Sequence, residues 1–79
     1  MKVIVNVYLK NGVLDPQGKA VHHALGSLGF GSVEDVRIGK QILLEVQGTD
    51  VEAARKDIIL MCEELLANTV IEDYTIEFA

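Results

Sequence analysis

An α+β domain with the element order βαββαβ is predicted by three features of the sequence. Four segments carry apolar residues in the manner of strands, two longer segments carry them at helical spacing, and turn or capping residues separate the six. A chain of 79 residues has the size of one small domain, so residues 1–79 are interpreted as a single unit. It contains no linker, internal repeat or low-complexity segment.

The first strand is predicted over residues 2–10, because side chains there alternate between two faces. One face carries Val3, Val5, Val7 and Leu9, and the other carries Ile4, Asn6 and Tyr8. The second face is mixed rather than polar, so we expect another surface to cover it.

The first helix is predicted over residues 16–28. Gly12 can take the positive φ of the preceding turn, Asp15 is a good N-cap, and Pro16 suits the first helical position. Gly29 stands where a left-handed residue ends many helices, and Phe30 follows it. The predicted buried stripe consists of Ala20, Val21, Ala24, Leu25 and Leu28.

A second strand is predicted over residues 33–38 and a third over residues 41–47, joined by a two-residue hairpin at Gly39 and Lys40. The second helix is predicted to begin near Asp50, with Thr49 and Glu52 as a capping box, and to end near Asn68. The fourth strand is predicted over residues 71–78.

This order predicts a ferredoxin-like unit, in which two right-handed crossovers place both helices on one face of a four-stranded antiparallel sheet. Strands one and three would be central, and strands two and four would form the edges. The other face would stay uncovered, and we expect the chain to self-associate through it, with Ile4, Tyr8 and Leu43 as candidate contacts.

Composition excludes several classes of function. A net charge of −5 argues against a nucleic-acid backbone or an anionic membrane as ligand. The sequence shows no signal peptide and no spanning apolar run, so we expect a cytoplasmic protein. Hydrophobic residues make up 49% of this small chain, which indicates that part of them is buried against a partner.

No catalytic, cofactor-binding or metal-binding constellation is predicted. His22 and His23 are adjacent on a helix, so their side chains diverge by about 100° and are expected on a solvated surface. Cys62 is the only cysteine, and it lies on the apolar side of the second predicted helix, where it is expected to be a core residue.

Five polar residues are candidates for contact with a partner protein. Lys10, Arg37 and Lys40 are a large share of the seven basic residues in an acidic chain, and they flank the first turn and the predicted hairpin. Protection of an edge strand by charge explains them equally well. Asp15 and Gln17 could both cap their helix and present hydrogen bonds outward. Whether these five positions share one pocket stays open.

Specific motifs resemble those of the PurS family, the small subunit of bacterial formylglycinamide ribonucleotide amidotransferase. The family pattern LK-x-GVLDPQG-x-A matches residues 9–20, and AL-x-x-LGF, VR-x-GK and LLANPVIEDY match residues 24–30, 36–40 and 65–74 in order and spacing. The one plain departure is Thr69, which stands where the family usually has proline.

The resemblance implies a non-catalytic subunit that bridges a PurL-type synthetase and a PurQ-type glutaminase and aids ammonia transfer between them. The complex is a ligase of de novo purine biosynthesis, phosphoribosylformylglycinamidine synthase, which uses glutamine and ATP. ATP and magnesium would bind the synthetase subunit, with no cofactor in this chain. A homodimer or homotetramer is expected from the fold and the residue pattern together.

A ferredoxin-like dimeric domain that binds a small regulatory molecule is the alternative interpretation. An RNA-binding module is disfavoured, because the predicted sheet lacks a paired aromatic platform and the net charge is negative. A metallochaperone of this fold would need two nearby cysteines, and this chain has one.

Overall fold

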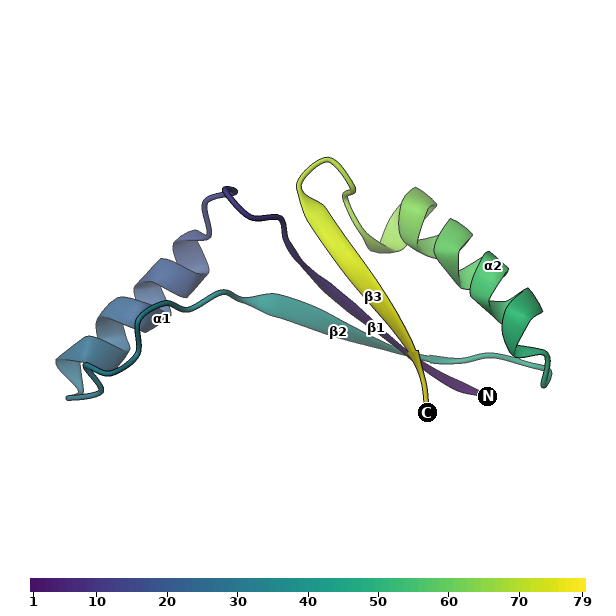
Figure 1. The fold of residues 1–79 in the computed structure, drawn as a ribbon, viewed down its shortest axis with the longest axis horizontal. Coiled ribbons are helices and arrows are strands. Elements are labelled where there is room, and N and C mark those ends of the chain that lie inside the picture. Colours follow the sequence, from purple (N-terminus) through teal and green to yellow (C-terminus); the bar gives the residue numbers. More distant parts are fainter.

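The computed structural model describes residues 1–79 and contains three strands and two helices. Their order is β1 (Lys2–Leu9), α1 (Pro16–Ser27), β2 (Gly39–Glu45), α2 (Val51–Met61), the π-helical turn η1 (Cys62–Leu66) and β3 (Glu72–Phe78). The strands form one antiparallel sheet in the order β2-β1-β3 (Figure 1). The α+β class and the central place of the first strand are as predicted. The third predicted strand, which is β2, lies at an edge of the sheet and not at its centre.

The prediction of a second strand over residues 33–38 is wrong, so the sheet has three strands and not four. These residues have no strand structure and run beside α1. The Val33 carbonyl forms a hydrogen bond with the His22 side chain of α1, and the Ile38 N–H donates to Asp15, the N-cap of α1. Their apolar residues, Val33, Val36 and Ile38, also lack the strict alternation of a half-buried strand. Hydrogen bonds to the helix region therefore replace pairing in the sheet.

The predicted hairpin at Gly39 and Lys40 is also wrong, because both residues belong to β2 and pair with β1. Gly39 lies opposite Tyr8, and a Cβ atom at Gly39 would come within 2.8 Å of the Val7 carbonyl oxygen. Glycine is needed here because two backbones approach each other closely. The predicted third strand over residues 41–47 thus begins and ends two residues earlier.

The core lies between the sheet and α2. Val3, Val5 and Val7 point to this side of β1, and Ile58 and Cys62 meet them from α2 and η1. The five side chains are at most 2% exposed. The alternation predicted for β1 and the core position predicted for Cys62 are confirmed.

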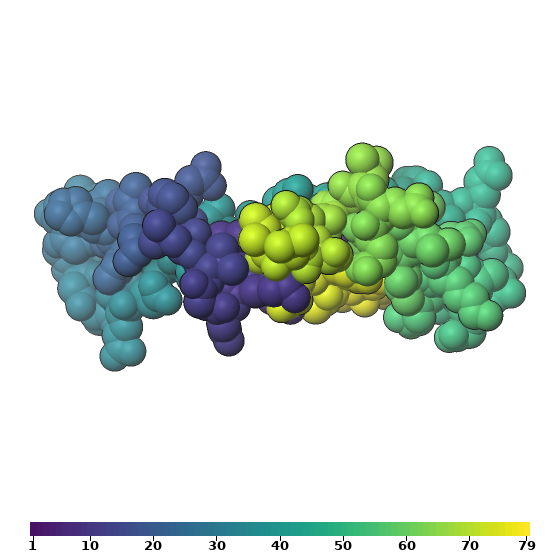
Figure 2. Space-filling view, turned by 90° about the horizontal axis from the view of Figure 1, so that it is seen from above, coloured from purple at the N-terminus to yellow at the C-terminus, as the bar shows by residue number.

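The helix α1 does not cover the sheet, which corrects the prediction that both helices share one face. Figure 1 shows α1 and the segment after it projecting beyond the end of the sheet, while α2 lies along the sheet. Figure 2 shows the resulting elongated shape, with α1 at one end and α2 at the other. The radius of gyration is 16.0 Å, against about 12 Å for a compact chain of this length. We call residues 10–38 the arm.

The ends of the helices follow from their capping residues. The Asp15 carboxylate accepts a hydrogen bond from the Gly18 N–H, and Gly29 has a φ of +98°, so both predicted caps of α1 are confirmed. The N-cap of α2 is Asp50, which accepts from the N–H groups of Glu52 and Ala53. Thr49, the N-cap of the predicted capping box, does not have that role. The turn η1 was not predicted.

Candidate partner-binding site

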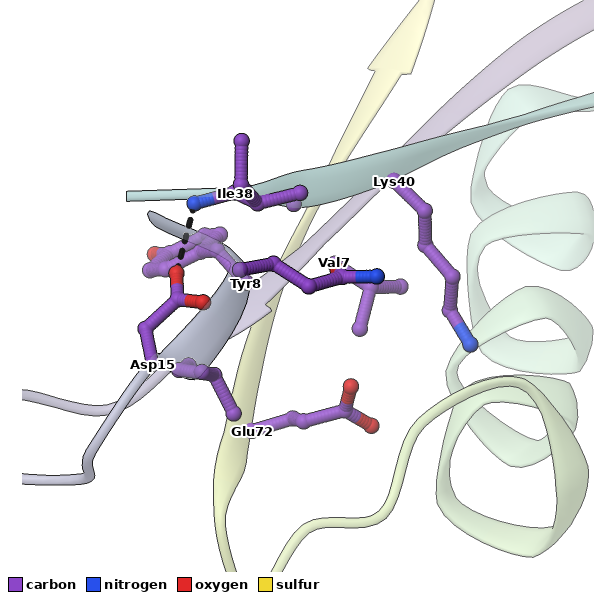
Figure 3. Close-up of a pocket in the computed structure, with 9 residues that line it drawn as sticks. Val7, Tyr8, Asp15, Ile38, Lys40 and Glu72 are labelled. Atoms are coloured by element: carbon purple, nitrogen blue, oxygen red, sulfur yellow. Dashed lines mark hydrogen bonds between the residues drawn. The ribbon is translucent and has the colours of Figure 1, made fainter. Parts of the chain in front are cut away.

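The five polar residues predicted to contact a partner gather at one end of the sheet, where the arm joins it. Asp15, Gln17 and Lys40 line one cavity of about 230 Å³ together with Glu72 at the start of β3. In Figure 3, Asp15 lies beside Ile38, and the charged ends of Lys40 and Glu72 extend to the other side of the cavity. Val7, Tyr8, Leu9, Ile38 and Gly39 complete the lining.

Lys10 and Arg37 lie at the same junction but do not line the cavity. The Lys10 ammonium forms an ion pair with Asp73 at 3.0 Å, and the Lys10 N–H donates to the Ile71 carbonyl. The Arg37 guanidinium donates to the Lys10 carbonyl at 3.2 Å. Two segments far apart in the sequence, around Lys10 and around Asp73, are therefore held together here.

Asp15 is the one buried charged residue, with 4% of its surface exposed. Its Oδ1 accepts from the Gly18 N–H at 2.8 Å, and its Oδ2 accepts from the Ile38 N–H at 2.7 Å. These two hydrogen bonds hold the pKa of the Asp15 carboxyl below its ordinary value, and the nearby Arg37 guanidinium lowers it further. Asp15 is thus an anion with a structural role, so Gln17, Lys40 and Glu72 are the cavity groups left to meet a partner.

The face of the sheet opposite α2 holds the residues predicted for self-association. Val3, Val5 and Val7 are buried beneath α2, so Ile4 and Tyr8 point the other way, together with Leu43 opposite Ile4. Leu43 is 64% exposed and Tyr8 is 43% exposed. The shared face is as predicted, and the role of these three residues stays a prediction.

A row of polar side chains crosses the middle of this face and was not predicted. The Gln41 amide donates to Asn6, and the Asn6 amide donates to the Thr75 hydroxyl, at 3.1 and 3.2 Å. The three residues are aligned by the register of β2, β1 and β3. The row could be predicted only from the register in which the three strands pair, and the sequence does not state that register directly.

Other polar groups are engaged in structural contacts. His22 is half-buried and forms a 2.8 Å hydrogen bond with the Val33 carbonyl, while His23 is exposed, so the solvated position predicted for both histidines holds for His23 alone. The Tyr74 hydroxyl donates to Glu63 at 2.9 Å. No three histidine, cysteine, aspartate or glutamate side chains lie together as metal ligands would. None of the helices has the length and apolar character needed to cross a membrane.

The family model for PurS, described as phosphoribosylformylglycinamidine (FGAM) synthase, matches residues 2–79. The chain belongs to the PurS family. It is 54% identical over 78 residues to the PurS subunit of Bacillus subtilis, covering 96% of this chain and 89% of that subunit. It is 45% identical over 75 residues to the Mycobacterium leprae PurS subunit, covering 95% and 91%.

Solved PurS structures share the fold. The B. subtilis PurS structure matches with a TM-score of 0.80 at 54% identity, covering 96% of this chain and 94% of that one. The Methanocaldococcus jannaschii PurS, a subunit of formylglycinamide ribonucleotide amidotransferase in purine biosynthesis, matches with a TM-score of 0.86 at 39% identity, covering 96% and 92%. A chain of the Thermotoga maritima PurLQS structure matches with a TM-score of 0.88 at 34% identity, covering 96% and 93%. PurS is thus a subunit of a purine-biosynthetic ligase complex, phosphoribosylformylglycinamidine synthase.

Proposed function

We propose that this chain is the non-catalytic subunit that joins a PurL-type synthetase to a PurQ-type glutaminase in phosphoribosylformylglycinamidine synthase. The observation that carries the proposal is the match along 96% of the chain to PurS in the T. maritima PurLQS structure. The elongated shape supports it, because a narrow body of 48 × 25 × 14 Å exposes most of its residues to contact. Only nine of its 79 residues are buried.

The junction between arm and sheet is the proposed contact with the partner subunits. Lys40 and Glu72 carry opposite charges on one cavity, and Gln17 adds an amide that can donate and accept. Lys10 and Arg37 lie next to it, each held by a hydrogen bond or an ion pair. Such mixed charges suit a specific protein surface, because each charge favours an opposite charge in a defined place on the partner.

Self-association is part of the proposal. The arm exposes apolar side chains that nothing in the chain covers, among them Leu14 at 64%, Leu28 at 73% and Phe30 at 56% exposure. The face with Ile4, Tyr8 and Leu43 is a second exposed surface. A homodimer or homotetramer would bury these surfaces, since a small protein rarely leaves large apolar patches in water.

The division of chemistry follows from the same proposal. ATP and magnesium would bind the synthetase, the glutaminase would release ammonia, and this chain would hold the two in the relative position that lets ammonia pass. A cytoplasmic location belongs to this proposal as well.

Complex formation tests the proposal directly. The chain is mixed with purified PurL-type and PurQ-type subunits of the same source and examined by size-exclusion chromatography with light scattering. We expect one species that contains all three, and no stable species of PurL and PurQ alone. A stable and active PurL–PurQ species that excludes this chain would contradict the proposal.

A further inference from the structure

The direction of the arm depends on very few contacts. The arm leaves β1 at Lys10 and returns to the sheet at Gly39, and neither sheet face nor α2 supports α1 (Figure 1). Within the arm, residues 33–38 run back along α1 without pairing with a strand. The hydrogen bonds that fix this returning segment therefore decide how α1 stands relative to the sheet.

Asp15 makes the central contact, because one carboxylate serves two elements. Its Oδ1 caps α1 at the Gly18 N–H, and its Oδ2 accepts from the Ile38 N–H, one residue before β2 begins. The start of the helix and the start of the strand are thus held by a single buried side chain. Figure 3 shows the bond to Ile38.

Gly18 makes this arrangement possible. A Cβ atom at Gly18 would lie 2.3 Å from the Val36 carbonyl oxygen and 2.8 Å from the Asp15 Oδ2 atom. The backbone of the returning segment therefore touches the first turn of α1 at a distance that only glycine permits. Further along, the hydrogen bond between His22 and the Val33 carbonyl holds the same segment to the helix.

We propose that the Asp15 carboxylate, seated against Gly18, is a positioning clamp that sets the direction of the arm and so holds Gln17 beside Lys40 and Glu72 for assembly with the PurL-type and PurQ-type subunits. We define the clamp as the hydrogen bonds from Gly18 and Ile38 to Asp15. The inference rests on the proposed assembly role of the chain. If the arm is already fixed before association, less conformational entropy is lost on binding. Loss of the clamp therefore weakens assembly although every contact residue is still present.

The variant Asp15→Asn separates the clamp from the helix cap. The asparagine oxygen can still accept from the Gly18 N–H, but its NH₂ group cannot accept from the Ile38 N–H. Asp50→Asn is the matched control, because Asp50 caps α2 through the N–H groups of Glu52 and Ala53 and is exposed. Gly18→Ala is a second variant. It keeps the Asp15 carboxylate in the sequence, but its Cβ atom would collide with both the Val36 carbonyl oxygen and the Asp15 Oδ2 atom, so it opens the clamp by displacement.

Two measurements are made on each full-length variant. Amide hydrogen exchange reports on Ile38, and titration with the purified PurL-type and PurQ-type subunits reports on assembly. For Asp15→Asn we expect faster exchange at Ile38, unchanged helix content by circular dichroism, and assembly weakened on the order of tenfold or more, the usual effect of losing a hydrogen bond to a charged group. Gly18→Ala should show the same pattern, and Asp50→Asn should assemble as the unmodified chain does.

The outcomes distinguish the clamp from the proposed function. If Asp15→Asn or Gly18→Ala exposes the Ile38 amide and yet assembles with unchanged affinity, the clamp has no positioning role. If Asp15→Asn fails to fold, the clamp is tested with Gly18→Ala alone, again by comparing exchange at the Ile38 amide with the affinity of assembly. Failure of the unmodified chain to assemble would overturn the proposed function itself, whereas the exchange result at Ile38 would still show whether the clamp holds the arm.

Discussion

Ile4 and Leu43 lie directly opposite each other in the β1–β2 ladder, on the face of the sheet that no helix covers. Leu43 is 64% exposed, and the polar row of Gln41, Asn6 and Thr75 runs beside the pair. An exposed leucine and a half-buried isoleucine next to a hydrogen-bonded row form a surface with both apolar area and fixed polar partners. It is therefore one of two surfaces available to a second copy of the chain, the other being the arm.

Leu43→Lys tests the sheet face. A charge at this position would be buried without a partner in a face-to-face dimer, so we expect a shift toward monomer in sedimentation, with secondary structure retained. Val21→Lys, on α1, is the matched variant for the arm, because Val21 is also exposed, at 41%. An unchanged mass for Leu43→Lys with a lower mass for Val21→Lys would move the self-association surface to the arm.

Ile58 is the side chain on which packing of α2 against the sheet depends most. It is fully buried against Val3, Val5 and Val7, so Ile58→Ala should lower the free energy of unfolding by ~2–5 kcal/mol. Urea denaturation followed by circular dichroism measures this loss. Leu60→Ala is the control, because Leu60 is 58% exposed and its truncation should change stability by no more than about 0.5 kcal/mol. Equal losses in the two variants would show that α2 packs through another face.

Thr69 occupies a turn that proline would suit. The Ile71 N–H donates to the Asn68 carbonyl at 3.0 Å, which makes Thr69 the second residue of a turn, a position that proline favours. No hydrogen bond is formed by the Thr69 N–H, so proline removes none. We expect Thr69→Pro to raise the free energy of unfolding by ~0.4–1 kcal/mol through the unfolded state. A clear loss of stability would show that this loop needs a conformation that proline forbids.

Cys62 should be unreactive in the folded chain. Burial raises the pKa of its thiol above the ordinary value, and the neighbouring Glu63 raises it further, so less of the reactive thiolate is present near pH 8. We expect slow modification by a disulfide reagent in buffer and rapid modification in urea. Equal rates in both solutions would contradict the burial of Cys62 beneath the sheet.

The parts of the fold that the sequence predicted are those decided by local patterns. Alternation in β1, the cap at Asp15, the left-handed Gly29 and the core position of Cys62 depend on residues close in the chain. Residues 33–38 could not be assigned in this way, because their place depends on Asp15 and Gly18, about twenty residues earlier. The prediction that Ala20, Val21, Ala24, Leu25 and Leu28 of α1 form a buried stripe is wrong. Leu25 is half-buried and the other four are exposed, because this chain provides nothing to cover α1.

The sequence predicts which residues belong to the candidate site but not how they are arranged in space. Charge and motif single out Lys10, Asp15, Gln17, Arg37 and Lys40. They do not single out Glu72, although it lines the same cavity, because nothing in the sequence indicates that the start of β3 meets the start of α1. The register of Leu9 opposite Glu72 provides that information.

We expect this chain to supply position and no bond-forming group, and a comparison of two nitrogen donors tests this claim. Amidation of formylglycinamide ribonucleotide is measured with purified synthetase and glutaminase, with and without this chain, using either glutamine or abundant ammonia. We expect omission of the chain to abolish the rate with glutamine and to leave part of the rate with added ammonia. Added ammonia reaches the synthetase from solution, so it does not have to be delivered from the glutaminase. Equal glutamine-driven rates with and without the chain would contradict the claim.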